Sequence, residues 1–330
     1  MSMGSCLDRP RRDGQDADEW KPSTAEEAAA NIDEWYNAGR LLFPRDNLQS
    51  IHDQLQKPLK SGDLIYVRAF DGSMYEYPVR IGEKQGTYVF DDEDFDEDGL
   101  ARATERKKID TVLGVPHIYY TSYESLKQGL EWSLSRAYCP IGIAHFMERA
   151  GQEVVTVSEV EVEAELKSFR DITSKWEDGD TWRGIKSTLL SLDLCCKIPK
   201  VIGMACGRFT ATSGYDWYER SAVQHALLIL LKRMLEESGL GTEQVACYAQ
   251  DPVYSPADQA VMKELGIQEV NDPEGFLQMD DSSLVFCCSP NICVKQIMAD
   301  MARPSIIIWC SVREDDPKYS SYGALSLILD

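Results

Sequence analysis

Small and hydroxyl-bearing residues follow the first of four apolar runs in the second half of the chain. The run ends at Cys206, and Gly207, Arg208, Thr210 and Ser213 come directly after it. If the run is a strand of a parallel sheet, these residues lie at the edge where such sheets bind ligands. Backbone N–H groups at a helix start attract negative charge, so Gly207 and Arg208 are candidate substrate-binding residues in an anion or ester cradle. The alternative is an ordinary turn, because the segment lacks the G-x-G-x-x-G pattern.

A covalent mechanism needs a thiol or hydroxyl that a neighbouring group activates. Cys206, Thr210, Thr212 and Ser213 qualify by position, and Cys206 and Ser213 are taken as catalytic candidates. The chain has no G-x-S-x-G elbow, which argues against an α/β-hydrolase. His225 is a candidate substrate-binding residue, although a lone histidine on a helix is more often packed and hydrogen-bonded than functional.

Acids and amides follow the other runs. Asp251 comes after the second run, where nucleotide-binding sheets hold a ribose hydroxyl. The alternative is that Asp251-Pro252 forms a turn and caps the next helix. Other polar residues on or near the predicted edge, all substrate-binding or catalytic candidates, are Asp216, Glu219, Ser289, Asn291, Glu314, Asp315 and Asp316.

The elements that must position these residues are strands and helices in alternation. The apolar runs span residues 200–206, 244–249, 283–289 and 305–311. A helix over 219–238 is predicted between the first two runs, and Gly239 supplies its stop. A second helix over 257–265 precedes Gly266. This alternation predicts an α/β fold, a Rossmann-like and mostly parallel sheet with flanking helices, over residues 161–330.

The first half of the chain predicts an N-terminal α+β extension. Residues 1–24 are charged and aperiodic, which indicates a disordered tail. Residues 25–160 form the extension, in which Ser23 or Thr24 caps a helix over 25–35 and a second helix spans 45–55. Short strands are expected at 63–70, 74–79 and 86–90. Further helices are expected at 122–136, 141–149, 164–176 and 181–194.

Seven of the eight residues from Asp91 to Asp98 are acidic. Such a run is usually a solvated loop. The alternative is a site for a cation or a basic partner, although the run lacks the ligand spacing of a calcium loop. The basic residues that follow, Arg102, Arg106, Lys107 and Lys108, could pair with the run or contact phosphates.

Composition limits the function further. The 330 residues carry a formal net charge of −21, which argues against a general nucleic-acid coat. Neither a membrane-spanning apolar run nor a signal peptide is evident, so we expect a cytoplasmic or nuclear protein. Several of the ten cysteines lie inside apolar runs without zinc-ligand spacing, so reduced core thiols are expected, with no metal and no cofactor.

Seven segments of the second half together resemble the Sensitivity to Red Light Reduced (SRR-like) domain, over residues 165–315. The most specific is Asp251-Pro252-Val253-Tyr254, between a glutamine-bearing helix and a Leu-Gly turn. The chain departs from the Gly-x-Gly-Ser loop of that family, since it has Ala205-Cys206-Gly207-Arg208 there. The matching segments are 200–207, 221–228, 251–255, 265–266, 274–275, 286–290 and 306–311.

The resemblance implies two different functions. Plant and animal members look like regulators linked to the circadian clock, which implies a non-enzymatic regulatory or interaction protein. A fungal branch resembles arginine-containing cyclodipeptide synthases, which join two aminoacyl groups from charged tRNAs into a diketopiperazine. That branch carries an Asp-Asp-x-x-Glu signature, and Asp315-Asp316-Pro317-Lys318-Tyr319 supplies both aspartates without the final glutamate. The long N-terminal extension favours the synthase, with aminoacyl-tRNA, including arginyl-tRNA, as substrate and partner.

The synthase chemistry would need three things from the chain. Two esters must be held in attack geometry, with backbone donors near the carbonyl oxygen. Carboxylates must pair with the guanidinium of an arginyl group, which the acids near the edge could do. Basic clusters must bind tRNA against the overall charge, and residues 102–108, Arg208 and 197–200 are the candidates. A third, weaker interpretation is a nucleotide- or S-adenosylmethionine-binding enzyme, which depends on Asp251 and the sheet topology.

Overall fold

The computed structural model describes residues 5–7, 11–12, 22, 24–91, 106–131, 134–151, 156–211, 218–288, 290–310 and 325–328. The chain divides into two compact units. Unit 1 contains residues 1–42 and 50–154, and unit 2 contains residues 43–49 and 155–330. The boundary predicted after residue 160 falls inside a helix that begins at Glu159.

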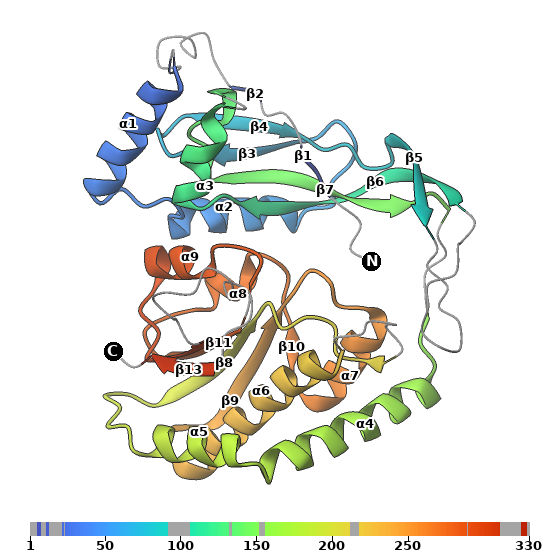
Figure 1. Cartoon of the computed structure of the whole chain (residues 1–330), viewed down its shortest axis with the longest axis vertical. Helices are drawn as coiled ribbons and strands as arrows, with labels where there is room; N and C mark the ends of the chain where they lie inside the picture. The colour runs from blue at the N-terminus through green and yellow to red at the C-terminus, as the bar shows by residue number, and fades with distance from the viewer. Residues whose placement is uncertain are drawn as a thin grey trace. The chain divides into compact units, whose positions relative to one another are not determined.

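Unit 1 consists of two antiparallel sheets with short helices (Figure 1). One sheet has the order β1-β7-β6-β5, and the other has the order β2-β4-β3. Of the two predicted caps, Thr24 is the one that caps α1, since its side chain accepts a hydrogen bond from the Glu27 amide at 3.1 Å. The bounds are β1 Ser5–Leu7, β2 Arg11–Arg12, α1 Ala25–Asn37, β3 Leu64–Arg68, β4 Met74–Pro78, β5 Lys84–Asp91, β6 Arg106–Tyr120, α3 Tyr123–Gln128 and β7 Ile141–Arg149. Helix α2, Arg45–Leu55, spans the division between the units.

Three expectations for the first half were wrong. Residues 141–149 form the central strand β7 and not a helix, because a strand buried on both faces shows no alternation and reads like a short buried helix. The helix over 122–136 ends at Gln128 and is followed by two 3-10 turns, Gly129–Glu131 and Leu134–Arg136. Strands β1 and β2 fall inside the predicted disordered tail, because each pairs with a sheet through backbone bonds that need no apolar run.

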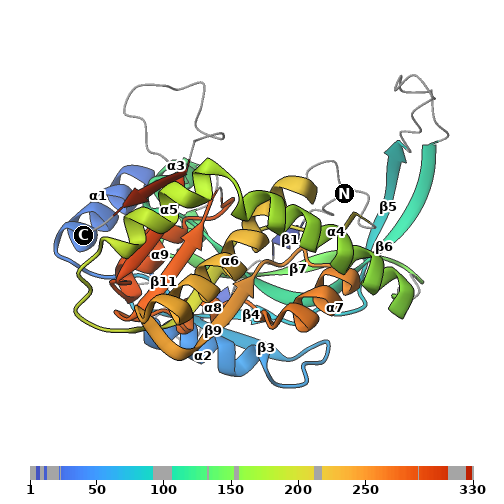
Figure 2. The same cartoon turned by 90° about the horizontal axis from the view of Figure 1, so that it is seen from below.

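The acidic run at 91–98 begins at Asp91, the last residue of strand β5. Strands β5 and β6 form an antiparallel hairpin, which Figure 2 shows in side view. Asp91 pairs with Arg106 at the last position of the ladder. Residues 92–98 and Arg102 lie outside the described residues, so the role of the run and of the basic residues beyond it stays a prediction.

Unit 2 has the predicted α/β fold. Its sheet has the order β10-β9-β8-β11-β12-β13, in which the first five strands are parallel and β13 is antiparallel. The bounds are β8 Ile198–Met204, β9 Gly241–Gln250, β10 Gln268–Glu269, β11 Ser283–Cys287, β12 Ile306–Cys310 and β13 Leu325–Ile328. The four apolar runs are therefore confirmed as strands, while the short strand β10 was not predicted.

Helices cover both faces of this sheet (Figure 1). The two predicted crossover helices are present, and each ends at a glycine with positive φ, Gly239 and Gly266. Helix α5 stops at Leu190, short of the predicted 194. The bounds are α4 Glu159–Glu177, α5 Asp180–Leu190, α6 Tyr218–Ser238, α7 Pro256–Leu265, α8 Glu274–Leu277 and α9 Val294–Met301.

The core of unit 2 lies between the sheet and helices α4 to α7. Leu166 and Phe169 of α4 are buried in it, with Ile172 and Trp176 packed at its margin, so the predicted apolar stripe is confirmed as core packing. Cys206, Cys247 and Cys287 are buried and unpaired, as expected of reduced core thiols. Among the described residues, no helix is long and apolar enough to cross a membrane.

Candidate functional site at the carboxyl edge of the parallel sheet

The strand order defines where a ligand would bind in unit 2. In chain order the parallel strands run 3-2-1-4-5, so the connections diverge between the first strand, β8, and the fourth, β11. In sheets of this topology ligands bind outside the carboxyl ends of the strands at that divergence. The residues at this edge are Met204, Gln250, Cys287 and Cys310 with the segments that follow them. This edge is the candidate site.

The loop over 205–211 turns sharply away from the end of β8. Ala205 has φ 54° and Gly207 has φ 74°, a region that residues with a side chain rarely adopt. A Cβ on Gly207 would also lie 2.7 Å from Ser221 Oγ on α6, closer than such atoms approach. Glycine is therefore required at position 207 both by the turn and by the nearby helix.

Asp258 holds the middle of this loop. Its Oδ1 accepts hydrogen bonds from the amides of Phe209 and Thr210, both at 3.0 Å, and from Thr210 Oγ1 at 2.9 Å. Its Oδ2 accepts from the Ser255 amide at 2.7 Å and from Ser255 Oγ at 2.6 Å, in a capping box at the start of α7. Five donors satisfy this fully buried carboxylate, so its role is to fasten the loop to α7.

Asp251 and Glu165 hold the two ends of the loop. Asp251 Oδ2 accepts from the Gly207 amide at 2.7 Å, and its Oδ1 accepts from the Val253 amide at 3.1 Å. Glu165 Oε2 accepts from the Ala211 amide at 3.0 Å. Burial raises the pKa of Asp251, which the two amide bonds partly offset. One oxygen of Asp251 thus accepts within the Asp-Pro turn and the other accepts from the 205–211 loop, which fits a structural role better than a ribose ligand.

These contacts correct the predicted anion cradle. The amides at 207, 209, 210 and 211 all donate to carboxylates of the same unit. An anionic ligand would have to displace those carboxylates and then lie beside their negative charge. In this conformation the loop therefore binds the chain's own anions. The cap of α7 is also Ser255 and not Asp251.

Cys206 does not have the environment of a nucleophile. Its side chain is 1% exposed, and its Sγ lies 3.8 Å from the Met204 carbonyl as a donor. Burial, with the nearby Cys287 and Asp251, raises its pKa well above that of a free thiol. A thiolate is the reactive form of cysteine, so Cys206 is an inert core thiol in this structure.

His225 is enclosed in the core of unit 2. Its Nδ1 lies 2.7 Å from the Ser221 carbonyl and its Nε2 lies 3.0 Å from the Tyr254 hydroxyl. Because a carbonyl only accepts, we assign the proton to Nδ1, and Nε2 then accepts from Tyr254. The ring stacks on Phe209 at 4.1 Å, and burial lowers its pKa to about 4. His225 is thus a packed, neutral histidine, which corrects its assignment to substrate binding.

One known protein family matches part of the second half of the chain. Residues 185–326 match the family model of the SRR1 domain. The match begins in α5 and ends in β13, so it contains the whole parallel sheet and the candidate edge. This match supports an SRR-like domain at residues 185–326 of unit 2, as the resemblance implied. A search of curated proteins found no match. A search of solved structures found none either.

Three other predicted residues of the SRR-like domain lie near its carboxyl edge. The half-buried Arg208 donates from Nε to the Val253 carbonyl, which fixes its side chain along the loop. Glu219, in the first turn of α6, and Asn291, after β11, are exposed. The remaining candidates lie outside the described residues, and their roles stay predictions: Thr212, Ser213, Asp216, Ser289, Glu314, Asp315 and Asp316.

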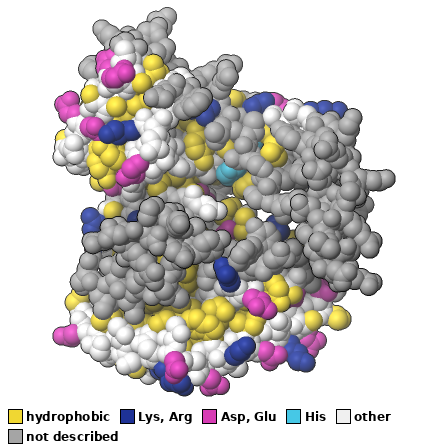
Figure 3. Space-filling view, viewed as in Figure 1, with side chains coloured by type: hydrophobic (Ala, Val, Ile, Leu, Met, Phe, Trp, Pro, Cys, Tyr) yellow, Lys and Arg dark blue, Asp and Glu magenta, His cyan; other side chains and the backbone are white. Residues whose placement is uncertain are grey.

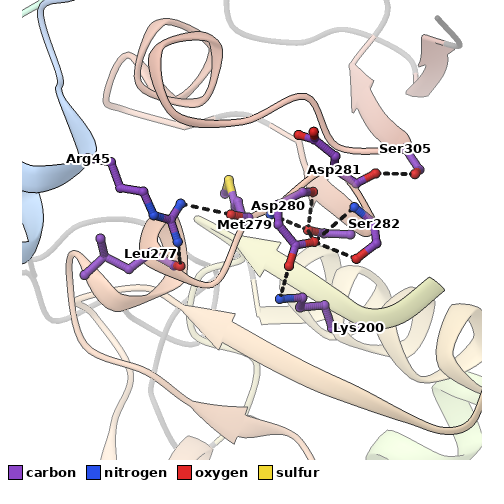
Figure 4. A network of polar contacts seen from close by, with 9 residues as sticks. Arg45, Lys200, Leu277, Met279, Asp280, Asp281, Ser282 and Ser305 are labelled. Atoms are coloured by element: carbon purple, nitrogen blue, oxygen red, sulfur yellow. Dashed lines mark hydrogen bonds and ion pairs between the residues drawn. The ribbon is translucent and has the colours of Figure 1, made fainter. Parts of the chain in front are cut away.

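The opposite, amino edge of the sheet has a dense polar network (Figure 4). Lys200 Nζ lies 2.6 Å from Asp280 Oδ2, and Asp280 also accepts from the amide and the hydroxyl of Ser282. Arg45 donates to the carbonyls of Leu277 and Met279, which attaches residues 43–49 to this domain. Since the Lys200 side chain is only 18% exposed and paired, it does not suit the phosphate contact that we predicted.

Sequence reasoning missed Asp258 and Glu165, and it named Tyr254 only as part of the 251–254 segment. Asp258 had a readable signal, because Ser255-Pro256-Ala257-Asp258 has the spacing of a capping box. Glu165 had no such signal, since it lies in an acidic stretch and only the fold brings it to Ala211.

Among the described residues, no group of three or more His, Cys, Asp or Glu side chains could hold a metal ion.

Proposed function

We propose that the SRR-like domain is a non-catalytic regulatory or interaction module. The observation that carries this proposal is the occupation of the 205–211 loop by the chain's own carboxylates. Acyl transfer needs free donors that face the developing oxyanion, and these amides have no free N–H to offer. The loop is instead a rigid connection between β8, α4 and α7.

The described candidates for nucleophile and base support the same conclusion. Covalent catalysis requires a nucleophile within hydrogen-bonding reach of a base. Cys206 is a buried thiol, and both ring nitrogens of His225 are engaged with Ser221 and Tyr254. These groups stabilise the domain and are not arranged to attack a substrate.

A second candidate is the tRNA-dependent, arginine-containing cyclodipeptide synthase. The strand order favours it, because β12 ends at Cys310 on the carboxyl edge and Glu314, Asp315 and Asp316 follow shortly in the sequence. Carboxylates in that position would suit the guanidinium of an arginyl substrate. If the protein is this synthase, Ser213, Asp315 and Asp316 would carry out the aminoacyl transfer.

The charge distribution favours the module over the synthase. tRNA binding requires clustered Lys and Arg contacts with phosphates. The chain has a net charge of −21, and Lys200 is paired with Asp280. On the face drawn in Figure 3, a band of hydrophobic side chains in unit 2 is bordered by single acidic and basic side chains.

One expression experiment separates the two candidates. The full chain is expressed in a host with charged tRNAs, and the culture is examined by mass spectrometry for arginine-containing diketopiperazines. The variant Asp315→Ala/Asp316→Ala is compared with Glu243→Ala/Glu264→Ala, which removes the same charge from two exposed positions. The module predicts no product from the soluble wild-type chain. A product that disappears only in the Asp315/Asp316 variant would refute the module and establish the synthase.

A binding experiment tests whether the acidic run at 91–98, which belongs to unit 1, contributes to partner binding by the full chain. The acids of residues 91–98 are replaced by their amides in the full chain, and bound proteins are quantified by mass spectrometry in cells of the source organism. Selective loss of a defined partner, with the wild-type chain as reference, is the expected result. An unchanged set of bound proteins would contradict the assignment of binding to this run.

A further inference from the structure

Cys288 and Cys310 lie side by side at the carboxyl edge of the sheet. Strands β11 and β12 are parallel, and their last paired residues are Cys287 and Trp309. Cys288 and Cys310 are the next residues on the two strands, so they occupy matching positions one step past that pair. The two thiol groups lie close enough to interact electrostatically, and both residues are partly exposed.

We infer that Cys288 and Cys310 are an oxidative modification site, a dithiol that a small disulfide such as glutathione disulfide converts into an intramolecular disulfide. The inference does not depend on whether the domain is catalytic. Neighbouring strands lie about 4.8 Å apart, within the roughly 4.4–6.8 Å range of Cα separations that disulfides span. The pair lies one position past the last β11–β12 pair, and Cys310 also pairs with Leu325 of β13.

The other thiols at this edge are less suited to the same reaction. Successive residues of a strand point to opposite faces, so Cys287 points away from Cys288. Cys287 and Cys206 are also buried, with 0% and 1% exposure. An oxidant can therefore reach Cys288 and Cys310 more readily than either neighbour.

The reaction balances in two exchange steps. One thiolate attacks glutathione disulfide, which forms a mixed disulfide and releases one glutathione thiolate. The second protein thiolate attacks that mixed disulfide, which forms the Cys288–Cys310 bond and releases the second glutathione. Two protein thiols are oxidised, one glutathione disulfide is reduced to two glutathione molecules, and the two thiol protons pass to the released glutathione.

Oxidation of this pair should be slow at neutral pH and faster in base. Burial and the neighbouring Cys310 raise the pKa of Cys288 to about 12, so its thiolate is scarce at pH 7. Whichever thiol reacts first, Cys288 acts as a thiolate in one of the two steps. Where that step limits the rate, the rate should rise about tenfold between pH 7 and pH 8.

The experiment uses the folded, full-length chain with glutathione disulfide. Free thiols are alkylated at timed intervals, and peptides are mapped by mass spectrometry. A peptide linked through Cys288 and Cys310 is the expected product, together with at least about tenfold slower hydrogen exchange in α9, which lies inside the closed loop. Cys288→Ser and Cys310→Ser should each stop at a stable glutathione adduct, whereas the matched variant Cys287→Ser should still form the link.

Three results would overturn the inference. One is the absence of a linked peptide from chain that hydrogen exchange shows to be folded. Another is linkage through Cys287 or Cys206 in preference to Cys288. The third is a link that forms only in urea, since the reaction would then belong to the unfolded chain.

Discussion

His225 gives the sharpest prediction, because its environment ties the stability of the SRR-like domain to pH. The ring is fully buried, and its pKa is lowered from 6.5 to about 4 by burial. In the unfolded chain the ring binds a proton below about pH 6.5, whereas in the folded domain it does so only below about pH 4. The stabilisation is therefore complete above pH 6.5 and is lost as the pH falls from 6.5 to 4.

The magnitude follows from the two pKa values. Lowering the pKa from 6.5 to about 4 corresponds to about 3 kcal/mol between the two limits. At pH 5 most unfolded chains carry the proton and few folded chains do, so about 2 kcal/mol should already be lost relative to pH 7.5. That loss corresponds to about a 30-fold change in the folding equilibrium constant.

The variant His225→Gln tests this reasoning, because glutamine keeps a donor and an acceptor but does not titrate. Hydrogen exchange of α6 amides reports the unfolding free energy of this domain at pH 7.5 and pH 5.0, after correction for intrinsic exchange rates. The wild-type domain should lose about 2 kcal/mol more than the variant between the two pH values. Asp251 and other groups titrate in both proteins, so their effects cancel in the difference.

A control separates titration from simple destabilisation. Phe209→Leu removes the ring that stacks on His225 but leaves the titrating group in place. It should lower stability at both pH values and keep the wild-type pH dependence. If His225→Gln shows the same pH dependence as the wild-type domain, His225 does not titrate as a buried neutral group, and the reasoning is refuted.

Three further substitutions test the loop and the amino edge by urea unfolding. Gly207→Ala should lower the free energy of unfolding by about 1–3 kcal/mol, because position 207 has a positive φ and the new Cβ would meet Ser221 Oγ. Adding Ser221→Ala should recover part of that loss. No recovery would contradict the steric argument. Asp258→Asn should lower the free energy of unfolding by about 3–5 kcal/mol, because the new amide nitrogen would face N–H donors of the loop. Glu264→Gln is the exposed control, and an equally small loss in both variants would contradict the anchoring role of Asp258. Burial alone would raise the pKa of Asp280, but hydrogen bonds from Lys200, Ser282 and Ser283 lower it to about 2. Its stabilisation should be present above pH 3.8 and fade as the pH falls toward 2. Since the Asp280 side chain is 49% exposed, Asp280→Asn should lower the free energy of unfolding by only about 1 kcal/mol at pH 7. An equal loss at pH 3 would argue against the Lys200–Asp280 ion pair.

The sequence by itself determined the local elements of the second half. Apolar runs bounded by turn residues predicted β8, β9, β11 and β12, and helix signals such as Gly239 marked where the crossovers end. These signals are local, because a strand or a helix end depends on residues within a few positions. The same local reasoning was wrong at 141–149, because burial on both faces removes the alternation that distinguishes a strand from a helix.

Only the tertiary structure decided what the polar residues do. Gly207 and Asp251 are 44 positions apart, and Phe209 and Asp258 are 49 apart, so no local pattern could pair them. Position along the chain showed that Cys206 and His225 lie near the sheet edge, but burial and hydrogen bonding depend on every element packed around them. A carboxylate, thiol or imidazole becomes a ligand, a nucleophile or a packing group according to that surrounding, which forms only when distant segments meet.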